Sequence, residues 1–543
     1  MPKVSKYLMI IIILILSAII AVLFSKIVPY NADEFTTYQV IYCNYYEHNS
    51  LNKFPPIGCG SIDLNFLNTS LMLFMHSGTE YTGSFASFYY YPLFLVWRSP
   101  LSARFLGMIF ILISAVLLGR IFKIGYEKIF VGLVLFFPFF FVHLVDTGPV
   151  KFQVMSIFLL YYLLIKWCER FKIIYPILIS IVIFIGIWDK LTYLMLIPGI
   201  LIILLIFLFE NTKRALGKNN LKKLLIQGVV SALILLFLMS MLFLSVSEGD
   251  GRPHFTYVLD WQLVGEEHVP DSIKDHGVFR TLINPFEAVK KIYHVKEPNV
   301  LVYIYILFIY LSPLFLIGLT IVKSKKKKKD IKKILKPLIM YLAFIVTILI
   351  MFRIRGTDCM HHTILAYPFL ILSFFTALQG VRKVLKPVNY KKLILIWCVV
   401  FVILNAYFFI VFPSQSIIPP DHPSKIEVNR ILNDEYLAKN YFYVVVDWGM
   451  YSYQSLYGNK HQSVLYIDPL LEQEEIDRLK EMSKEHQRKL LFIYLPYRDP
   501  PCDVCEVSDM DLIKANFELE ECIIHKDGWN IMYEMGDRDI CEN

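Results

Sequence analysis

Residues 7–34 read YLMIIIILILSAIIAVLFSKIVPYNADE, an apolar run from Tyr7 to Val28 that is followed by the acidic pair Asp33-Glu34. About 20 consecutive apolar residues are enough to cross the hydrocarbon core of a bilayer. Lys3 and Lys6 precede the run, and no small-residue cleavage site is obvious. We therefore expect a retained first membrane helix with a cytoplasmic N-terminus, rather than a cleaved signal peptide.

The composition of the whole chain agrees with a membrane protein. Of its 543 residues, 56% are hydrophobic and 15% are aromatic, and the mean hydropathy is +0.53. A soluble protein of this length is less apolar. The net charge of +8 comes from lysines that cluster between apolar runs. This pattern is typical of cytoplasmic loops next to membrane lipids, so we expect no nucleic-acid partner.

The basic clusters predict the topology, because cytoplasmic loops are rich in Lys and Arg and an even number of crossings must separate two such loops. Five later clusters are expected in the cytoplasm: Arg120/Lys123/Lys128, Lys166/Arg170/Lys172, Lys213 to Lys223, Lys323 to Lys336 and Arg382 to Lys392. Pairs of helices are expected over 129–165, 173–209, 224–322 and 337–381, and a last helix over about 393–412. The total is about 11 transmembrane helices, with the C-terminus outside.

Two of these pairs turn back at short polar breaks on the outer side. The breaks are Asp146-Thr147-Gly148-Pro149 and Trp188-Asp189-Lys190. Longer outer loops are expected over about 29–102 and 247–297. Within the first loop, Phe85 to Trp97 is short for a span and rich in aromatic residues, which predicts an interfacial or re-entrant helix. The second membrane helix would then start near Ala103-Arg104.

The chain after residue 412 has the composition of a separate domain. Residues 1–412 form the predicted transmembrane domain, and residues 413–543 form a small exoplasmic α/β domain joined by a linker at Pro419-Pro420 and Pro423. Strands are expected at Tyr443–Val446, Ser463–Ile467 and Leu490–Leu495, with an amphipathic helix over Glu472–His486. The predicted fold class is therefore mainly α, a polytopic membrane protein with a small C-terminal α/β domain.

Cysteine usage fits this topology, because seven of the nine cysteines fall on the outer side. They are Cys43, Cys59, Cys359, Cys502, Cys505, Cys522 and Cys541. Outside the cytoplasm disulfides are the default expectation, with free thiols or a metal site at Cys502-x-x-Cys505 as alternatives. The sequence does not assign the pairing.

Acidic residues on the outer side are the first candidates for chemistry. Asp33, Glu34 and Asp146 all lie beyond the expected helix ends. Taken singly, such acids are commonly solvated loop or turn residues. Together, two acidic sites on one face can deprotonate a hydroxyl group or hold a divalent cation, Mg²⁺ or Mn²⁺, with Asp33 and Asp146 as its ligands. The sequence leaves the need for a metal open.

Cationic residues on the same side are candidates for binding phosphate. Arg353, Arg355, His361 and His362 share one short outer loop. Arg binds phosphate through paired hydrogen bonds and His can add a donor, although interfacial anchoring is the alternative. Lys190 forms either an intramembrane ion pair with Asp189 or another phosphate contact. Lys53 and Arg104 complete this set.

Several short motifs, in this order, resemble the GT-C superfamily of integral membrane glycosyltransferases, in particular its protein mannosyltransferase and aminoarabinose transferase branch. The acidic pair in Asn31-Ala32-Asp33-Glu34-Phe35 follows the first helix, and Lys53-Phe54-Pro55-Pro56 is similar to a Pro-Pro element of that loop. Ala103 to Gly107, reading ARFLG, opens the second helix. Gly186 to Thr192 looks like the family's Gly-x-x-x-x-Lys-x-Thr hairpin apex, with one residue fewer between Gly186 and Lys190. The resemblance covers about residues 1–412.

The resemblance implies a polyprenyl-phosphate-linked sugar donor, a glycan, lipid or protein acceptor, and an exoplasmic site in the plasma or inner membrane. Asp33 would act as the general base on the acceptor hydroxyl, while Glu34 and Asp146 would position the acceptor or a metal. The cationic set would hold the lipid phosphate as it leaves. Direct displacement would invert the anomeric centre.

Three alternatives compete with this interpretation. An O-antigen ligase or polymerase also uses outer Arg and His residues, but its large outer loop usually lies late among the helices. A membrane transporter commonly shows internal repeats, and no clear repeat is visible here. A scaffold or receptor would act through residues 413–543. The acidic loop directly after the first helix favours the glycosyltransferase.

Overall fold

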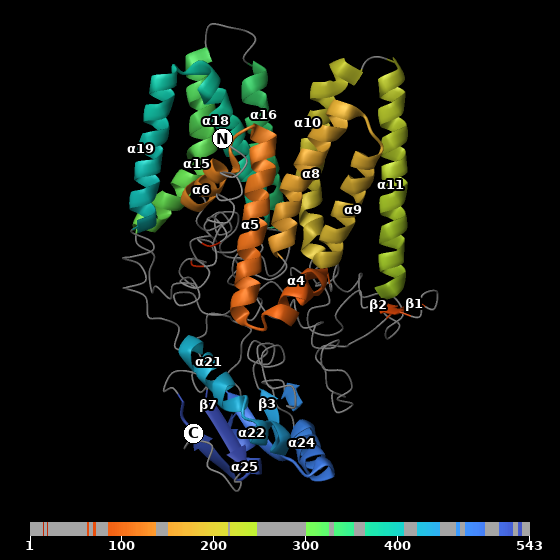
Figure 1. Cartoon of the computed structure of the whole chain (residues 1–543), viewed down its shortest axis with the longest axis vertical. Coiled ribbons are helices and arrows are strands. Elements are labelled where there is room, and N and C mark those ends of the chain that lie inside the picture. The colour runs from red at the N-terminus through yellow and green to blue at the C-terminus, as the bar shows by residue number, and fades with distance from the viewer. Residues whose placement is uncertain are drawn as a thin grey trace. The chain divides into compact units, whose positions relative to one another are not determined.

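The computed structural model describes residues 15, 19, 62–64, 69–71, 85–136, 150–215, 218–246, 300–324, 331–351, 364–406, 421–445, 463–466, 473–494, 510–524 and 530–534 (Figure 1). The chain divides into two compact units, which are treated separately below. The helical unit comprises Met1–Ala21, Tyr81–Phe85 and Arg104–Ser416. The sheet unit comprises Val22–Glu80, Ala86–Ala103 and Ile417–Asn543.

The helical unit contains the described part of the predicted transmembrane domain. Six helices in the described residues are long and apolar enough to cross a membrane, and two shorter apolar helices accompany them. The helices of this unit are α5 (Pro100–Phe122), α6 (Tyr126–Phe136), α8 (Val150–Arg170), α9 (Ile174–Asp189), η1 (Leu191–Leu196), α10 (Ile197–Ala215), α11 (Lys218–Val246), α15 (Val300–Ser324), α16 (Ile331–Met351), η3 (Ile364–Ala366), α18 (Tyr367–Val384) and α19 (Pro387–Ala406). The count of about 11 spans stays a prediction.

The predicted helix pairs match the described helices, and two predicted starts are wrong. α5 begins at Pro100 rather than near Ala103-Arg104. The Ser99 hydroxyl accepts a hydrogen bond from the Leu101 amide at 3.3 Å, and proline at a first helical position needs no hydrogen-bond partner for its nitrogen. α19 likewise begins at Pro387, six residues before the predicted start near residue 393.

The centre of the helical unit is formed by α8 and α18. Within its most apolar stretch, α18 is 94% buried, and it packs against α8, α15 and α16. By contrast, 17% of the most apolar stretch of α11, within Lys222–Ser240, is buried, and this helix contacts α9 and α10. Because α11 exposes Leu, Ile, Val and Phe side chains, its surface suits a lipid environment rather than water.

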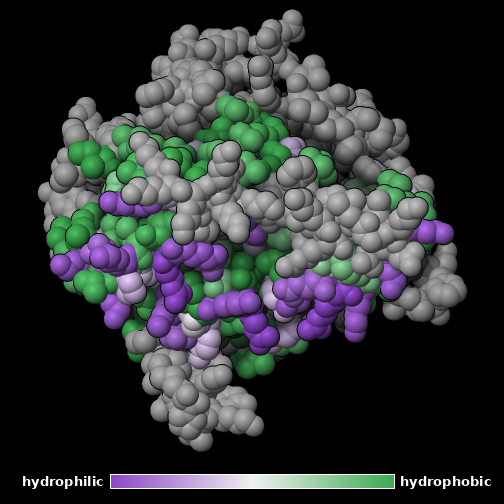
Figure 2. Space-filling model, turned by 90° about the horizontal axis from the view of Figure 1, so that it is seen from above, coloured by the Kyte–Doolittle hydropathy of each residue, from purple (hydrophilic) through white to green (hydrophobic). Residues whose placement is uncertain are grey.

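Basic side chains gather at one end of these helices. The last turns of four helices carry Arg120, Arg170, Lys323 and the pair Arg382-Lys383. Further lysines or short connecting segments lie at the starts of the helices that follow Arg170, Lys323 and Arg382-Lys383. Figure 2 shows hydrophilic side chains gathered in a band across the face seen from above. This distribution agrees with the expected cytoplasmic loops, while the sidedness itself stays a prediction.

The sheet unit contains a five-stranded sheet in the order β4-β3-β5-β7-β6. Its strands are β3 (Tyr441–Val445), β4 (Ser463–Tyr466), β5 (Lys489–Tyr494), β6 (Leu519–Cys522) and β7 (Asn530–Glu534). The first three run parallel, while β7 is antiparallel to both β5 and β6. Four helices accompany the sheet: α21 (Asp421–Leu432), α22 (Glu435–Asn440), α24 (Gln473–His486) and α25 (Met510–Asn516). Side chains of α24 and α25, including Ile476 and Ile513, pack with Phe442 and Phe492 in one hydrophobic core.

The three predicted strands and the predicted helix of this region are confirmed within one or two residues. The linker prediction is wrong at Pro423, which lies in the first turn of α21, where proline costs the helix no hydrogen bond. Cys522 is disulfide-bonded, while Cys398 is a free thiol. Cys398 is one of the two cysteines that the sequence did not place on the outer side. The exoplasmic location and the 412/413 boundary stay predictions.

Two smaller elements belong to the region between the first helix and α5. The strands β1 (Ile62–Leu64) and β2 (Thr69–Leu71) form an antiparallel hairpin. Helix α4 (Phe85–Val96) confirms the predicted short helix. It exposes Phe88, Leu95 and Val96, as expected of a helix at a membrane interface, although that position is a prediction.

Candidate functional site

The candidate site is built around the break between α9 and α10. Helix α9 ends at Asp189, Lys190 adopts an extended conformation with φ −161° and ψ 132°, and the chain continues through η1 into α10. The Lys190 amide donates to the Gly186 carbonyl at 3.3 Å, and the Tyr193 amide donates to the Lys190 carbonyl at 2.9 Å. The predicted break at residues 188–190 is therefore confirmed. We call the end of α9, η1 and the first two turns of α8 the α8–α9 junction.

Gln153 on α8 ties the two sides of this junction together. Its Nε2 donates to the Lys190 carbonyl at 2.8 Å and to the Gly186 carbonyl at 3.3 Å. Its Oε1 accepts from Thr192 Oγ1 at 3.5 Å. The Gly186 and Lys190 carbonyls already accept the two backbone hydrogen bonds given above, so this one buried amide supplies the second hydrogen bond that each carbonyl oxygen can accept.

Ser156 and Tyr193 add a second bridge between α8 and η1. The Ser156 hydroxyl donates to the Gln153 carbonyl at 2.6 Å and lies 2.7 Å from Tyr193 Oη. Because the serine proton is used in the first bond, Tyr193 is the donor in the second. The tyrosine ring lies against Gly186, where an added Cβ atom would come within 2.6 Å of ring carbons. Glycine at position 186 is therefore required by the approach of this ring.

Three ionisable side chains are buried in the junction. Lys151 and Asp189 have no exposed surface, and Lys190 is 4% exposed. Neither carboxyl oxygen of Asp189 has a hydrogen-bond partner among the described residues. Asp189 interacts electrostatically with Lys190, its neighbour in the chain, without a hydrogen bond between the two side chains. A buried carboxyl group without a hydrogen-bond donor is uncommon in a structural core and is frequent at functional sites.

Aromatic rings line the same region of the helical unit. The Phe85 ring lies 5.1 Å from that of Phe152 on α8 and 5.4 Å from that of Trp188 on α9, measured between centroids. Phe184 lies 6.0 Å from Trp188. Trp188 itself is half-buried. The charged groups of the junction are thus accompanied by apolar surface, as in most small-molecule sites.

The junction also adjoins the start of α18. η3, which begins at Ile364, contacts η1, α8 and α16. In the sequence, His361 and His362 directly precede η3, and Asp146 lies four residues before α8. The described elements next to three predicted outer segments, namely the start of α8, η1 and η3, therefore lie close together at the α8–α9 junction.

Of the ten candidate residues from the sequence, the structure places two. Lys190 lies in the junction, and Arg104 on α5 is completely buried. The other eight lie outside the described residues: Asp33, Glu34, Lys53, Asp146, Arg353, Arg355, His361 and His362. Among the described residues, no group of three His, Cys, Asp or Glu side chains is placed to hold a metal ion. The divalent cation stays a hypothesis.

The sequence interpretation overlooked Lys151, Gln153 and Tyr193. A signal for the first two exists, because Lys151 and Gln153 follow Gly148-Pro149 and open an otherwise apolar helix. Polar residues in that position are costly inside a membrane and commonly functional. Tyr193 carries no comparable sequence signal.

Comparison with known proteins gives matches to solved structures alone. No protein-family model and no curated protein matches the sequence. The structure of ArnT from Cupriavidus metallidurans in the apo state aligns over 98% of both chains, with 11% identity and a TM-score of 0.45. The Archaeoglobus fulgidus oligosaccharyltransferase, in complex with Zn and sulfate, aligns over 89% of this chain and 68% of its own, with 12% identity and a TM-score of 0.38.

Proposed function

We propose that the protein is a membrane glycosyltransferase that transfers a sugar from a polyprenyl-phosphate donor to a glycan, lipid or protein acceptor on the exoplasmic face. The observation that carries the proposal is the buried Lys190 at the break after α9, within the motif Gly186-x-x-x-Lys190-x-Thr192. Each residue of that motif has a defined place: Gly186 admits the Tyr193 ring, and Thr192 bonds to Gln153. A lysine held in this way can meet the phosphate of a lipid-linked sugar.

The chemistry requires a cationic site and a base. Lys190, with Lys151 in the same junction, would stabilise the negative charge of the departing lipid phosphate. Arg353, Arg355, His361 and His362 would add hydrogen bonds from the loop that leads into η3, and Lys53 and Arg104 would extend the cationic set. Asp33 would remove the proton of the acceptor hydroxyl, with Glu34 and Asp146 positioning the acceptor or a Mg²⁺ or Mn²⁺ ion.

The phosphate-binding part of this proposal is tested by the affinity for polyprenyl phosphate, the product that would remain after sugar transfer. Purified protein in nanodiscs is titrated as wild type, Lys190→Met and Lys336→Met. Lys336 is the matched control, because its ammonium group lies over the Phe207 ring at 5.0 Å and therefore outside the junction. We expect Lys190→Met to weaken binding about tenfold or more, as for a lost hydrogen bond to a charged group, and Lys336→Met to bind like wild type. Equal affinities of all three proteins would refute the role of Lys190.

The orientation is tested by labelling single cysteines in intact cells. We propose that the N-terminus and the loop of Lys325–Lys329 are cytoplasmic and that the C-terminal domain is exoplasmic. A cysteine at position 327 should then resist a membrane-impermeant maleimide, while Cys introduced at exposed Glu481 should react. Reaction of the cysteine at position 327 with the maleimide from outside would show the opposite topology and would contradict the proposed function.

A further inference from the structure

Asp189 stands apart from every other polar side chain of the α8–α9 junction. Gln153, Ser156, Thr192 and Tyr193 all make hydrogen bonds across the junction. Asp189 is as deeply buried as they are, and yet neither of its carboxyl oxygens accepts a hydrogen bond from a described residue. Four buried side chains of the junction are thus hydrogen-bonded, while the carboxyl group of Asp189 receives no hydrogen bond within the described part of the chain.

An unpartnered carboxyl group in this position costs the fold free energy. Burial removes its water, and no donor among the described residues replaces that water. Ser or Ala at position 189 would avoid the cost without disturbing the Gln153 bonds, which go to backbone carbonyls. Groups that lower stability in this way are commonly retained for binding or catalysis.

The surroundings restrict what kind of partner the carboxyl group can take. Lys190 follows it directly, and Lys151 is buried in the same junction, so a further cation would meet two like charges. A metal is not favoured either, because the described residues contain no group of three His, Cys, Asp or Glu side chains that could hold one. A neutral hydrogen-bond donor such as a hydroxyl group remains. The paired rings of Phe85 and Trp188, at the end of α9 that carries Asp189, supply aromatic surface of the kind that lines ligand sites.

We propose that Asp189 is a sugar-binding residue, whose carboxyl oxygens accept hydrogen bonds from hydroxyl groups of a sugar that lies next to the lipid phosphate. The inference rests on the proposed function, since it assumes that Lys190 meets that phosphate. Lys190 then binds the phosphate group of the ligand, and the Asp189 carboxyl group binds the sugar next to that phosphate. The sugar can belong to the donor or to the acceptor, because both present hydroxyl groups.

The first test needs no ligand and compares thermal unfolding in detergent. Asp189→Ala removes the two unpartnered oxygens, and Gln153→Ala removes an amide with three hydrogen bonds. We expect the midpoint of unfolding to rise by about 2–4 °C for Asp189→Ala and to fall for Gln153→Ala. A fall for Asp189→Ala of the same size as for Gln153→Ala would overturn the inference, because the carboxyl group would then belong to the internal network of the fold.

The second test measures which part of the ligand Asp189 binds. Wild type and Asp189→Asn are titrated with bare polyprenyl phosphate, with polyprenyl phosphates that carry a hexose, an N-acetylhexosamine or a pentose, and with the methyl glycosides of these sugars in the presence of the bare lipid. We expect wild type to gain about tenfold or more in affinity from one of the sugars, and Asp189→Asn to lose that gain while binding the bare lipid unchanged. A gain in the lipid-linked form assigns the sugar to the donor, and a gain from the methyl glycoside assigns it to the acceptor.

The inference and the proposed function can fail separately. If no sugar adds affinity in wild type, or if Asp189→Asn binds the bare lipid more weakly, Asp189 is not a sugar-binding residue. If wild type binds no polyprenyl phosphate at all, the proposed donor is wrong. In that case, the sign of the stability change and the methyl glycoside titration without lipid still decide whether Asp189 serves a ligand.

Discussion

The side chain of Gln153 on α8 holds the backbone of Lys190 at the end of α9, with 2.8 Å between Nε2 and the carbonyl oxygen. The opposite end of α8 has a matching arrangement. There, Gln227 of α11 donates to the Phe171 carbonyl at 2.8 Å and accepts from Trp167 Nε1 at 2.7 Å. One buried amide side chain therefore donates to a backbone carbonyl at each end of the α8–α9 hairpin. Of the two amides, only that of Gln153 bonds to the backbone of a charged residue.

This pairing predicts that Gln153 is a positioning residue for Lys190. Gln227→Leu removes the hydrogen bond to the Phe171 carbonyl, and Gln153→Leu removes the second hydrogen bond to each of the Gly186 and Lys190 carbonyls. Each substitution should therefore lower the free energy of unfolding by about 1–3 kcal/mol. Only Gln153→Leu should also weaken the binding of polyprenyl phosphate, because it frees the Lys190 backbone. Thermal unfolding and lipid titration of the two variants check this.

A double-mutant cycle separates positioning from general damage. If Gln153 acts through Lys190, adding Gln153→Leu to Lys190→Met should cause no further loss of lipid affinity. Losses that simply add, or an equal loss of affinity in Gln227→Leu, would show that Gln153 has only a structural role.

Two glycines should respond in opposite directions to alanine. A Cβ atom at Gly186 would lie within 2.6 Å of the Tyr193 ring, whereas one at Gly228 on α11 meets no atom within 4 Å. Gly186→Ala should therefore destabilise the protein by about 1–3 kcal/mol through overpacking, while Gly228→Ala should be neutral or stabilise α11 by up to about 1 kcal/mol. Thermal unfolding of both variants tests the tight contact of the ring, and equal midpoints would count against it.

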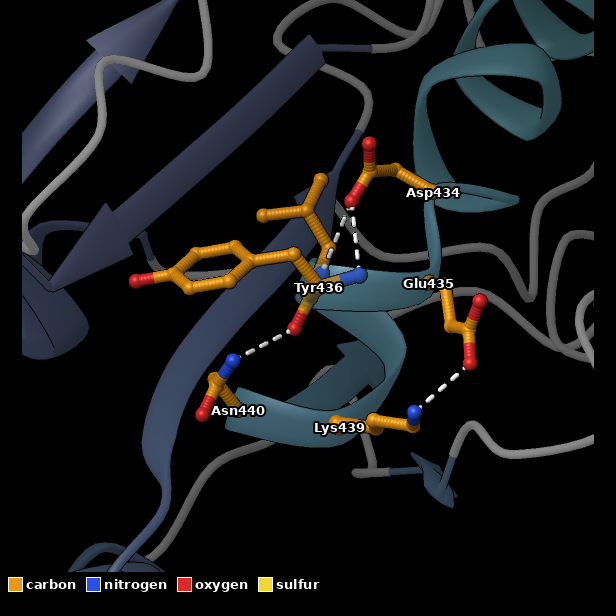
Figure 3. Close-up of polar contacts among 6 residues, drawn as sticks. Asp434, Glu435, Tyr436, Lys439 and Asn440 are labelled. Carbon is orange, nitrogen blue, oxygen red and sulfur yellow. Dashed lines mark hydrogen bonds and ion pairs between the residues drawn. The ribbon is translucent and has the colours of Figure 1, made fainter.

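In the sheet unit, Asp434 caps the short helix α22. Its Oδ1 accepts hydrogen bonds from the amides of Tyr436 at 2.8 Å and Leu437 at 3.1 Å (Figure 3). Asp434→Ala should cost about 1 kcal/mol and speed amide hydrogen exchange in α22. The neighbouring Glu435 pairs with Lys439 on the exposed surface, so Glu435→Ala should change exchange much less. Similar effects of the two substitutions would contradict the capping role.

Glu534 predicts how the stability of the sheet depends on pH. Burial raises the pKa of its carboxyl group above the ordinary value, although the Leu490 amide, which donates to it at 2.7 Å, and the nearby Lys489 oppose the shift. A raised pKa in the folded state means that the folded protein holds the proton more tightly than the unfolded chain. Its stabilising contribution is therefore complete below the unfolded pKa, and it is lost as the pH rises through the folded pKa.

Hydrogen exchange across β5 and β7, corrected for the intrinsic effect of pH, measures this contribution in the full chain. Protection should decline from mildly acidic to neutral pH in wild type, and Glu534→Gln should flatten the decline. Glu481→Gln, which changes an exposed carboxylate of α24, should leave the profile as it is. A profile that keeps its slope in Glu534→Gln would assign the pH dependence to another group.

Much of the helical unit could be predicted because hydropathy and the positions of lysines are local properties of the sequence. The break at Trp188-Asp189-Lys190 was visible because charged residues interrupt an apolar run. The starts of α5 and α19 were missed because Pro100 and Pro387 are favourable at a helix start, where proline also looks like a loop residue. In the sheet unit, β6 was missed because Leu519–Cys522 is mostly polar, as edge strands often are.

The junction itself could not be derived from the sequence. Gln153 binds carbonyl groups 33 and 37 residues further along the chain, so its role depends on how α8 and α9 pack. The same holds for Asp189, since the lack of a hydrogen-bond partner is a property of the packed junction and not of its neighbours in the chain.

The central claim is tested most directly by sugar transfer in proteoliposomes, from a panel of polyprenyl-phosphate sugars, with folded wild type and Asp33→Asn. A positioned general base contributes about 10²–10⁴-fold to the rate, so transfer by wild type should fall by that factor in Asp33→Asn. Equal rates in the two proteins would remove Asp33 from the mechanism. The absence of transfer from every donor by correctly folded wild type, measured with acceptor glycans, lipids and proteins from the same cells, would contradict the proposed glycosyltransferase.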